Sequence, residues 1–385
     1  MRIGYEAKRV YQNNTGLGNY SRTLLHSLAT AYKSEEFFLF APRKTSLFNE
    51  ELYPNLYGVF PTAFLDKKFP ALWRSMGAVK DIKNMGLDIF HGLSSELPVG
   101  IKNAGCKTVV TVADLIFEHY PAQYKTIDIN TYRAKTKYAC SAADVVIAIS
   151  NQTKQDLINL YNVPENKIQV CYQSCHPSYQ QTHTPFELEA IKEKYKLPEK
   201  YFLSVGSIIE RKDLLAICRA VVNNKKMGLH IPLVVIGNGG EYKKRVIQFV
   251  EQHHLKDLII FLNDKPTGND PGFTSSKDFP AIYAGAQAFI YPSVFEGFGI
   301  PVLEALWSKT PVITTNVSCM PETGGDAALY VDPHNDEQIS AHMQNIMSDA
   351  ELRNRMITKG IAHAQNFTPE ACAASVMNVY RNLMK

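Results

Sequence analysis

Residues 288–306 read AFIYPSVFEGFGIPVLEAL, a pattern typical of one strand, a glycine turn and a helix. The apolar run 288–291 predicts a buried strand, and two glycines follow within the turn. A helix is expected to start at about Ile300, because Pro301 suits a first helical turn, where no amide N–H is needed. A strand that leads through a turn into a helix is half of a β-α-β unit, the building block of a parallel sheet covered by helices.

The same alternation runs through the rest of the chain. Strands are predicted at 2–7, 37–40, 89–91, 108–112 and 145–149 in the first half, and at 201–205, 233–236, 258–261, 288–291 and 312–314 in the second. The aperiodic polar segment 173–186 is interpreted as a linker. We therefore predict an α/β fold of two Rossmann-like, doubly wound domains, residues 1–180 and 187–366, that face each other across a cleft.

Composition excludes several classes of protein. The 385 residues are 45% apolar and 20% charged, which is ordinary for a globular protein and unlike disordered or coiled-coil chains. Seven cysteines and a start without an apolar leader favour a reducing cytoplasm. No apolar run reaches the ~20 residues that a membrane-spanning helix needs. Residues 1–180 hold 20 Lys and Arg against 15 Asp and Glu, so the first half permits peripheral contact with the inner face of an anionic membrane, and an ordinary solvated basic face is the alternative.

The turn between the predicted strand 288–291 and the helix that starts at about Ile300 predicts a ligand that is both an anion and a hydrogen-bond donor. Gly297 and Gly299 let backbone amides approach a ligand, and the helix behind them offers N–H groups to an anion. Glu296 precedes this turn, and Glu304 lies about one turn into the helix. Carboxylates accept hydrogen bonds that a polyol can donate, so the combination indicates a ligand with both sugar and phosphate. A strand-turn-helix with incidental acids is the structural alternative.

The spacing of Glu296 and Glu304, with Gly-Phe-Gly-x-Pro-x-x-Glu, resembles the E-x7-E motif of glycosyltransferase family 4, the retaining GT-B enzymes. The resemblance continues through residues 309–313 and 321–328. Near the start of the chain, residues 15–20 are similar to the family's glycine loop. Residues 205–212 resemble the family segment that supplies basic groups to the donor diphosphate.

This resemblance implies a role for individual residues. Glu296 would hold hydroxyls of the transferred sugar, Glu304 would accept from the ribose, and Arg211 and Lys212 would neutralise the leaving diphosphate. Glu296, Arg211, Lys212 and Asp114 are the implied catalytic residues. Further donor-binding residues that it implies are Gly16, Gly206, Ser207, Gly297, Phe298, Gly299 and Ile300.

Two strand ends in the first domain are predicted to lie on the acceptor side. They carry His91 and Asp114, for which a structural histidine and a strand-capping acid are the alternatives. The family usually has His-Asp where this chain has Ala113-Asp114, and many relatives have Arg at the position of Ser207. The resemblance further implies that the last helix, 369–385, packs back on the first domain.

The expected activity is transfer of a hexose, mannose among the candidates, from a nucleotide-sugar to a hydroxyl of a glycan or lipid-linked acceptor in surface polysaccharide biosynthesis, with retention. No D-x-D stretch or paired zinc spacing is present, so we expect neither metal nor cofactor. Basic residues without interleaved aromatics argue against nucleic-acid binding. A nucleotide-sugar epimerase, a glycoside hydrolase and an inactive binding subunit are the alternatives. The nucleotide, sugar, acceptor, oligomeric state and the effect of Ala113 cannot be inferred.

Overall fold

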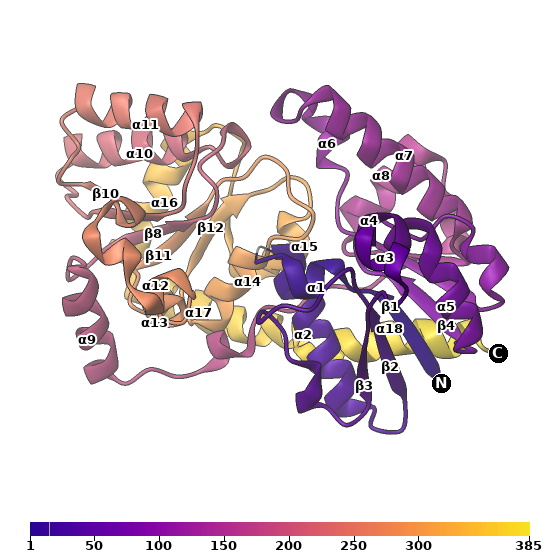
Figure 1. The fold of residues 1–385 in the computed structure, drawn as a ribbon. Helices are drawn as coiled ribbons and strands as arrows, with labels where there is room; N and C mark the ends of the chain where they lie inside the picture. The colour runs from indigo at the N-terminus through magenta and orange to yellow at the C-terminus, as the bar shows by residue number, and fades with distance from the viewer. Residues whose placement is uncertain (15) are drawn as a thin grey trace. The chain divides into compact units, whose positions relative to one another are not determined.

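The computed structural model describes residues 1–14 and 16–385. They form two compact α/β units: unit 1 is Met1–Ser174 with Phe367–Lys385, and unit 2 is Cys175–Asn366 (Figure 1). Each unit contains one parallel sheet. The predicted fold class, two doubly wound sheets, is confirmed.

The sheet of unit 1 has the strand order β3-β2-β1-β4-β5-β6-β7. Its strands are β1 (Arg2–Glu6), β2 (Glu36–Phe40), β3 (Leu56–Val59), β4 (Ile89–Gly92), β5 (Lys107–Val112), β6 (Val145–Ala148) and β7 (Ile168–Val170). Sequence patterns predict five of the seven and miss β3 and β7. Both missed strands lie at the edges of the sheet, where a short apolar run is enough to form a strand.

Helices cover both faces of this sheet. They are α1 (Lys8–Gln12), α2 (Gly16–Ala31), α3 (Phe64–Lys68), α4 (Pro70–Leu72), α5 (Ala78–Asn84), α6 (Ile116–His119), α7 (Thr126–Ala142), α8 (Asn151–Tyr161) and α18 (Pro369–Leu383). Alternate strand residues point to opposite faces. One face packs on α2 and α18, and the other on α5, α7 and α8.

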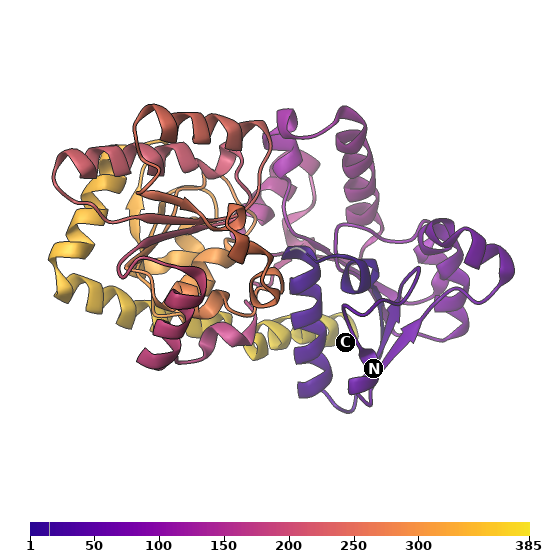
Figure 2. The same ribbon diagram turned by 60° about the vertical axis from the view of Figure 1, so that its left-hand side comes forward.

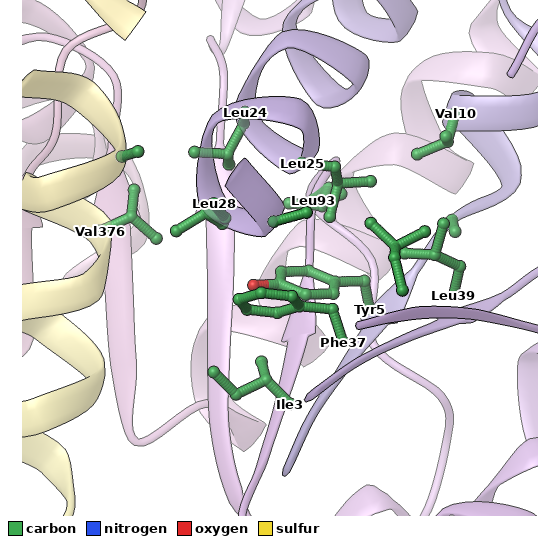
Figure 3. Close-up of a cluster of buried hydrophobic side chains, with 14 of the residues drawn as sticks. Ile3, Tyr5, Val10, Leu24, Leu25, Leu28, Phe37, Leu39, Leu93 and Val376 are labelled. Atoms are coloured by element: carbon green, nitrogen blue, oxygen red, sulfur yellow. The ribbon is translucent and has the colours of Figure 1, made fainter. Parts of the chain in front are cut away.

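The core between the sheet and helices α2 and α18 joins the two ends of the chain. Figure 3 shows Tyr5 and Phe37 rising from the strands toward Leu24 and Leu28 of α2, with Val376 of α18 beside them. All five side chains are buried. The last helix is therefore an integral part of the core of unit 1.

The sheet of unit 2 has the order β10-β9-β8-β11-β12-β13. Its strands are β8 (Phe202–Val205), β9 (Leu233–Ile236), β10 (Ile259–Phe261), β11 (Ala288–Tyr291), β12 (Val312–Thr315) and β13 (Leu329–Val331). Only the three-residue edge strand β13 was not predicted. In both sheets the first strand of the unit lies in the interior, and the chain adds strands first on one side of it and then on the other. The loops that follow the strands on either side therefore meet at the carboxyl end of the sheet, beside this first strand.

Helices also flank the sheet of unit 2 on both faces (Figures 1 and 2). They are α9 (Pro185–Tyr195), α10 (Leu214–Lys226), α11 (Glu241–Gln252), α12 (Pro271–Thr274), α13 (Phe279–Ala284), α14 (Ile300–Trp307), α15 (Met320–Gly324), α16 (Asp336–Ser348) and α17 (Ala350–Ala364). Helices α10, α11 and α16 share one apolar core with the sheet. No described helix is both long and apolar enough to cross a bilayer.

The change of unit at Cys175 falls inside the predicted linker 173–186, before the predicted domain end at residue 180. Part of that segment is ordered against unit 2. Tyr179 is 6% exposed, and its ring meets Tyr283 edge-on at 5.5 Å. Thr184 and Glu187 then form a capping box that starts α9. Aromatic packing therefore binds residues that composition alone assigned to a linker.

Candidate active site

The turn between β11 and α14 carries the predicted motif, and the turn after β12 fixes its backbone. The Glu296 N–H donates to Ser318 Oγ at 3.2 Å, and the Ser318 hydroxyl donates to the Glu296 carbonyl at 2.9 Å. Gly299 caps α14 with φ 93°, and a Cβ there would lie 2.6 Å from Met320 Cε. Only glycine satisfies both the left-handed backbone and the available space.

Arg211 and Lys212 lie on a short 3-10 turn, η7 (Glu210–Lys212), after β8. This turn is tied to the one after β11, because the Val294 N–H donates to the Arg211 carbonyl at 2.9 Å and the Arg211 guanidinium donates to the Phe295 carbonyl. Asp213 then caps α10 by accepting from the Ala216 N–H. The basic pair and Glu296 are therefore held together by the backbones of two neighbouring loops.

The Glu296 carboxylate collects several donors on one oxygen. Its Oε1 lies 2.7 Å from Arg211 Nη1, 2.8 Å from Ser293 Oγ and 2.9 Å from Tyr291 Oη. Lys212 Nζ donates to Tyr291 Oη at 2.6 Å and lies 3.7 Å from the same carboxylate oxygen. All of these contacts are made by Oε1.

These charged groups shift one another's pKa values. Burial opposes ionisation of Glu296, but Lys212 and Arg211 outweigh it and hold the pKa of the carboxyl below its usual value. Burial lowers the pKa of Lys212, and Glu296 acts in the opposite direction. Two cations against one carboxylate leave this cluster with one excess positive charge, which favours an anionic ligand.

Glu304 has a different environment. Its Oε2 accepts from Tyr283 Oη at 3.1 Å, and Tyr179 is a second hydroxyl partner. Burial raises the pKa of the Glu304 carboxyl to about 7. The hydrogen bonds from the two tyrosines and the charge of Lys212 lower this pKa, but they offset the effect of burial only in part. The two acids of the motif therefore differ: Glu296 is ionised throughout the neutral range, and Glu304 titrates within it.

The start of the segment 205–212, which follows β8, packs on the loop after β9. The Ile208 N–H donates to the Asn238 carbonyl at 2.8 Å, and a Cβ on Gly237 would lie 1.9 Å from the Gly206 carbonyl oxygen. Gly206 faces Lys212, whose Nζ would be 2.9 Å from a Cβ, and Ser207 is exposed. The glycines at 237 and 239 thus serve close loop packing.

The structure therefore brings together most of the predicted donor-binding residues of unit 2. Gly297, Phe298, Gly299 and Ile300 continue from Glu296 into the start of α14. Sequence reasoning missed Tyr291, Ser293, Tyr283 and Tyr179, which donate to the two acids. Tyr291 and Ser293 flank the motif and could have been noticed, whereas Tyr179 carries no local signal.

Two predicted residues of unit 1 have simple local roles. Gly16 is the first residue of α2 and is exposed, while Thr15, which opens the predicted glycine loop, lies outside the described residues. Asp114 follows β5, and its Oδ1 accepts from the Ile116 N–H at 3.1 Å. That contact matches the alternative of a strand-capping acid, and it leaves an acceptor role as a prediction.

His91 lies inside the core of unit 1. The side chain is fully buried, Nδ1 lies 2.6 Å from Tyr380 Oη on α18, and Nε2 lies 2.8 Å from Thr111 Oγ1 on β5. Burial lowers the pKa of the imidazole to about 3. Both ring nitrogens are engaged by protein groups, so the geometry favours a structural histidine over an acceptor-side residue.

A cavity of about 340 Å³ in unit 1 contains charged residues that sequence reasoning did not single out. Glu6 ends β1 and is 3% exposed, and Arg74 Nη1 lies 3.2 Å from its Oε1. Arg74 also pairs with Glu96, which Lys135 Nζ contacts at 3.0 Å. Leu97, Pro98 and Tyr138 supply apolar walls. An acid at the end of a buried strand was the available signal for Glu6.

The described residues contain no group of three His, Cys, Asp or Glu side chains arranged to hold a metal ion. The positive charge near the two acids comes from Arg211 and Lys212.

Family models match nearly the whole chain. Residues 187–363 match the family described as "Glycosyl transferases group 1", and residues 15–178 match "Glycosyltransferase Family 4". O-antigen chain mannosyltransferase B of Escherichia coli is 28% identical over the full length of both chains. The O-antigen chain mannosyltransferase RfbU of Salmonella typhimurium is 29% identical, over 62% of this chain and 60% of the relative.

Solved structures share the fold. A glycosyltransferase from Rickettsia africae has a TM-score of 0.74 at 20% identity and covers 100% of this chain and 98% of its own. WaaG, a glycosyltransferase involved in lipopolysaccharide biosynthesis, has a TM-score of 0.72 at 15% identity, over 98% and 99%. Anabaena HepE, solved with UDP-glucose, has a TM-score of 0.73 at 14% identity, over 99% and 100%. This chain is therefore a glycosyltransferase of the GT-B fold and belongs to glycosyltransferase family 4.

Proposed function

We propose that this glycosyltransferase moves a hexose, mannose first among the candidates, from a nucleotide-sugar to a hydroxyl of a growing surface polysaccharide. The carrying observation is the cluster in unit 2 in which Arg211 and Lys212 hold the Glu296 carboxylate. The excess positive charge suits a diphosphate, and the carboxylate suits a sugar hydroxyl. The names of the O-antigen mannosyltransferase relatives support mannose and the polysaccharide acceptor.

Each residue has a distinct part in the proposed reaction. The Glu296 carboxylate accepts from a hydroxyl of the transferred sugar, and Lys212 and Arg211 lower the energy of the negative charge that grows on the leaving diphosphate. The amides from Gly297 to Gly299 lie at the start of α14, where the helix dipole also favours an anion. Glu304 accepts from the ribose hydroxyls of the nucleotide.

The proposed reaction retains the anomeric configuration by front-face attack. The acceptor oxygen forms a bond to the anomeric carbon as the bond from that carbon to the diphosphate breaks, and the acceptor proton passes to the leaving phosphate. Glu296 serves as a hydrogen-bond acceptor in this scheme, because its ion pairs with two cations make it a weak base. The family resemblance supports retention.

We further propose that no metal is needed. The two fixed cations supply the charge that a divalent ion provides at other diphosphate sites. Transfer measured with and without a chelator tests this: an unchanged rate supports the proposal, and a rate restored only by added Mg²⁺ or Mn²⁺ contradicts it.

The acceptor is assigned to the cavity of unit 1. Glu6, Glu96, Arg74 and Lys135 present both acceptors and donors beside apolar walls, a combination that suits a glycan hydroxyl face. Lys135→Ala should raise KM for the acceptor and leave KM for the donor unchanged. Equal acceptor KM values in both proteins would place the acceptor elsewhere.

The deciding experiment for the activity is transfer from GDP-mannose or a UDP-hexose to a lipid-linked oligosaccharide. Appearance of an extended acceptor supports the transferase. Conversion of the donor in the absence of acceptor would favour an epimerase, and cleavage of an aryl glycoside without nucleotide would favour a hydrolase. Tight nucleotide binding without turnover would indicate a binding subunit.

A further inference from the structure

The two tyrosines beside Glu304 come from different segments of unit 2. Tyr283 stands on α13, and Tyr179 stands on the 3-10 turn η6 (Pro177–Gln180), which precedes the first strand of the unit. Both hydroxyls form hydrogen bonds with the Glu304 carboxyl, and Tyr283 Oη lies 3.1 Å from Oε2. Two separate segments of the chain therefore converge on the second acid of the E-x7-E motif.

The rings of the two tyrosines hold these hydroxyls in a fixed arrangement. Their centroids are 5.5 Å apart and their planes make an angle of 88°, an edge-to-face geometry that stabilises aromatic pairs. Tyr179 is 6% exposed and Tyr283 is fully buried. The Thr310 hydroxyl donates to the Tyr283 carbonyl at 2.7 Å, and Lys309 Nζ donates to Thr182 Oγ1 at 3.2 Å. Both segments are thus also tied to the residues that follow α14, so the hydroxyls define the direction of the carboxylate that they contact.

Glu304 changes its charge in the neutral range, whereas its two partners do not. Burial raises the pKa of its carboxyl to about 7, although hydrogen bonds from Tyr283 and Tyr179 and the charge of Lys212 lower it. Burial and the nearby charge of Glu304 raise the pKa of both tyrosines well above its usual value. Each hydroxyl therefore keeps the proton that it donates.

Titratable groups on the other elements that pack on α14 have partners of their own. Tyr291 of β11 donates to Glu296 at 2.9 Å, and His363 Nε2 of α17 lies 3.1 Å from the carbonyl oxygen of Glu322 on α15. The threonines at the end of β12 donate to backbone carbonyls. The protonation of Glu304 is therefore governed by its burial, the two tyrosines and Lys212.

We propose that Tyr179 and Tyr283 are positioning residues for the nucleotide: their hydroxyls orient Glu304 toward the ribose and set the pH range in which it accepts from the ribose hydroxyls. An ionised carboxylate accepts on both oxygens, and hydrogen bonds to a charged acceptor are roughly twice as strong as those between neutral groups. The nucleotide therefore binds the ionised form best, and pH sets the fraction of the protein in that form. This inference rests on the proposed function, in which Glu304 contacts the ribose.

Calorimetric titration with ribonucleotides and dideoxynucleotides isolates this contact. GDP, UDP and ADP are each compared with the 2′,3′-dideoxy form, which lacks both ribose hydroxyls, from pH 6 to pH 9. The ratio of the two dissociation constants is the hydroxyl preference, and titration of the phosphates cancels in it. For the nucleotide that binds the wild type, the hydroxyl preference should rise about tenfold from pH 6 to pH 8, because the ionised fraction of Glu304 rises by that factor around a pKa of about 7.

Tyr179→Phe and Tyr283→Phe each keep the ring and remove one hydroxyl. Loss of a donor to the carboxylate raises the pKa of Glu304, so the rise in hydroxyl preference should move by roughly one unit toward higher pH. The hydroxyl preference at pH 7 should then fall by about fivefold. Glu304→Gln should show a hydroxyl preference that does not change with pH, since an amide does not titrate.

Tyr201→Phe is the matched control, because Tyr201 is a buried tyrosine of unit 2 whose hydroxyl donates to the Ile282 carbonyl at 2.6 Å. It should keep the pH profile of the wild type. Binding of the dideoxy form shows that each variant is folded. If the two tyrosines were merely structural, their variants would bind both nucleotide forms more weakly but keep the wild-type pH profile.

The inference and the proposed function fail in different ways. A hydroxyl preference that is independent of pH in the wild type, or a wild-type pH profile in both Tyr179→Phe and Tyr283→Phe, would overturn the inference while nucleotide binding still supported the proposed function. A pH profile that persists in Glu304→Gln would also overturn it. A wild type that binds none of the three nucleotides would contradict the proposed function itself, and the inference with it.

Discussion

At the scale of single residues, Glu296 decides the chemistry of the site. It accepts from Arg211, Ser293 and Tyr291 on one oxygen and balances two buried cations. Glu296→Gln keeps the size of the side chain but removes its charge. We expect kcat to fall by at least about a hundredfold, in the range measured when one electrostatic contact to a transition state is lost.

The same variant should bind nucleoside diphosphate as well as the wild type or more tightly, since Arg211 and Lys212 lose their internal counter-charge. Initial rates and calorimetric titration measure the two effects. Glu337→Gln, an exposed acid of unit 2, controls for expression and handling. Wild-type turnover in Glu296→Gln would remove Glu296 from the mechanism.

Glu304 predicts a pH dependence of stability. Its folded-state pKa is raised from 4.5 to about 7 by burial, so the folded protein binds more protons than the unfolded chain between these values. Stability therefore falls as pH rises from about 4.5 to 7, by at most about 3 kcal/mol for this group.

Glu304→Gln should remove that contribution, so the difference in melting temperature between variant and wild type should grow in favour of the variant from pH 5 to pH 7.5. Thermal unfolding across this range measures it. A difference that stays constant with pH would show that Glu304 ionises as an ordinary exposed acid.

Sequence reasoning at the residue scale found the groups that carry local signals. Glu296, Arg211 and Lys212 follow strands, and they meet in the structure because parallel strands end at one edge of a sheet. The tyrosine partners of Glu304, Tyr179 and Tyr283, come from positions that only tertiary packing brings close. His91 lies within β4, but α18 covers it, and no local pattern reveals that contact.

At the scale of elements, α18 is the most informative helix, because it is separated in sequence from the core that it completes. Met377 and Tyr380 are fully buried among residues of α2 and β1. Met377→Ala should lower the free energy of unfolding by about 2–5 kcal/mol, the usual cost of emptying a packed methionine site. Asn378→Ala, exposed on the same helix, should change it little.

Urea unfolding measures both variants. If Met377→Ala were as stable as Asn378→Ala, α18 would be an appended helix rather than a part of the core of unit 1.

Most elements could be predicted, because central strands of a parallel sheet are continuous apolar runs between turn signals. The edge strands β3, β7 and β13 could not, since they are three or four residues long and half-exposed in part. The helical segment α3 to α5 was also missed. Its residues Leu65, Phe69, Leu72 and Met76 repeat at helical spacing, so the signal for a helix was available in the sequence.

At the scale of the whole molecule, the chain repeats one plan twice but divides the chemistry. Unit 2 holds the cationic cluster with Glu296, and unit 1 holds the mixed cavity. The repeated plan could be predicted from the alternation of strands and helices. The boundary between the two units was less predictable. Residues 175–180 are polar in composition, yet Tyr179 packs against Tyr283 and so attaches them to unit 2.

The central claim is that the cluster of unit 2 binds the diphosphate of a nucleotide-sugar. Calorimetric titration of GDP, UDP and ADP into three proteins tests it most directly: the wild type, Lys212→Ala, and Lys135→Ala as the control in unit 1. We predict that one nucleotide binds the wild type and Lys135→Ala equally and binds Lys212→Ala at least about tenfold more weakly, the usual cost of losing a hydrogen bond to a charged group. Equal affinity for the wild type and Lys212→Ala would contradict the account.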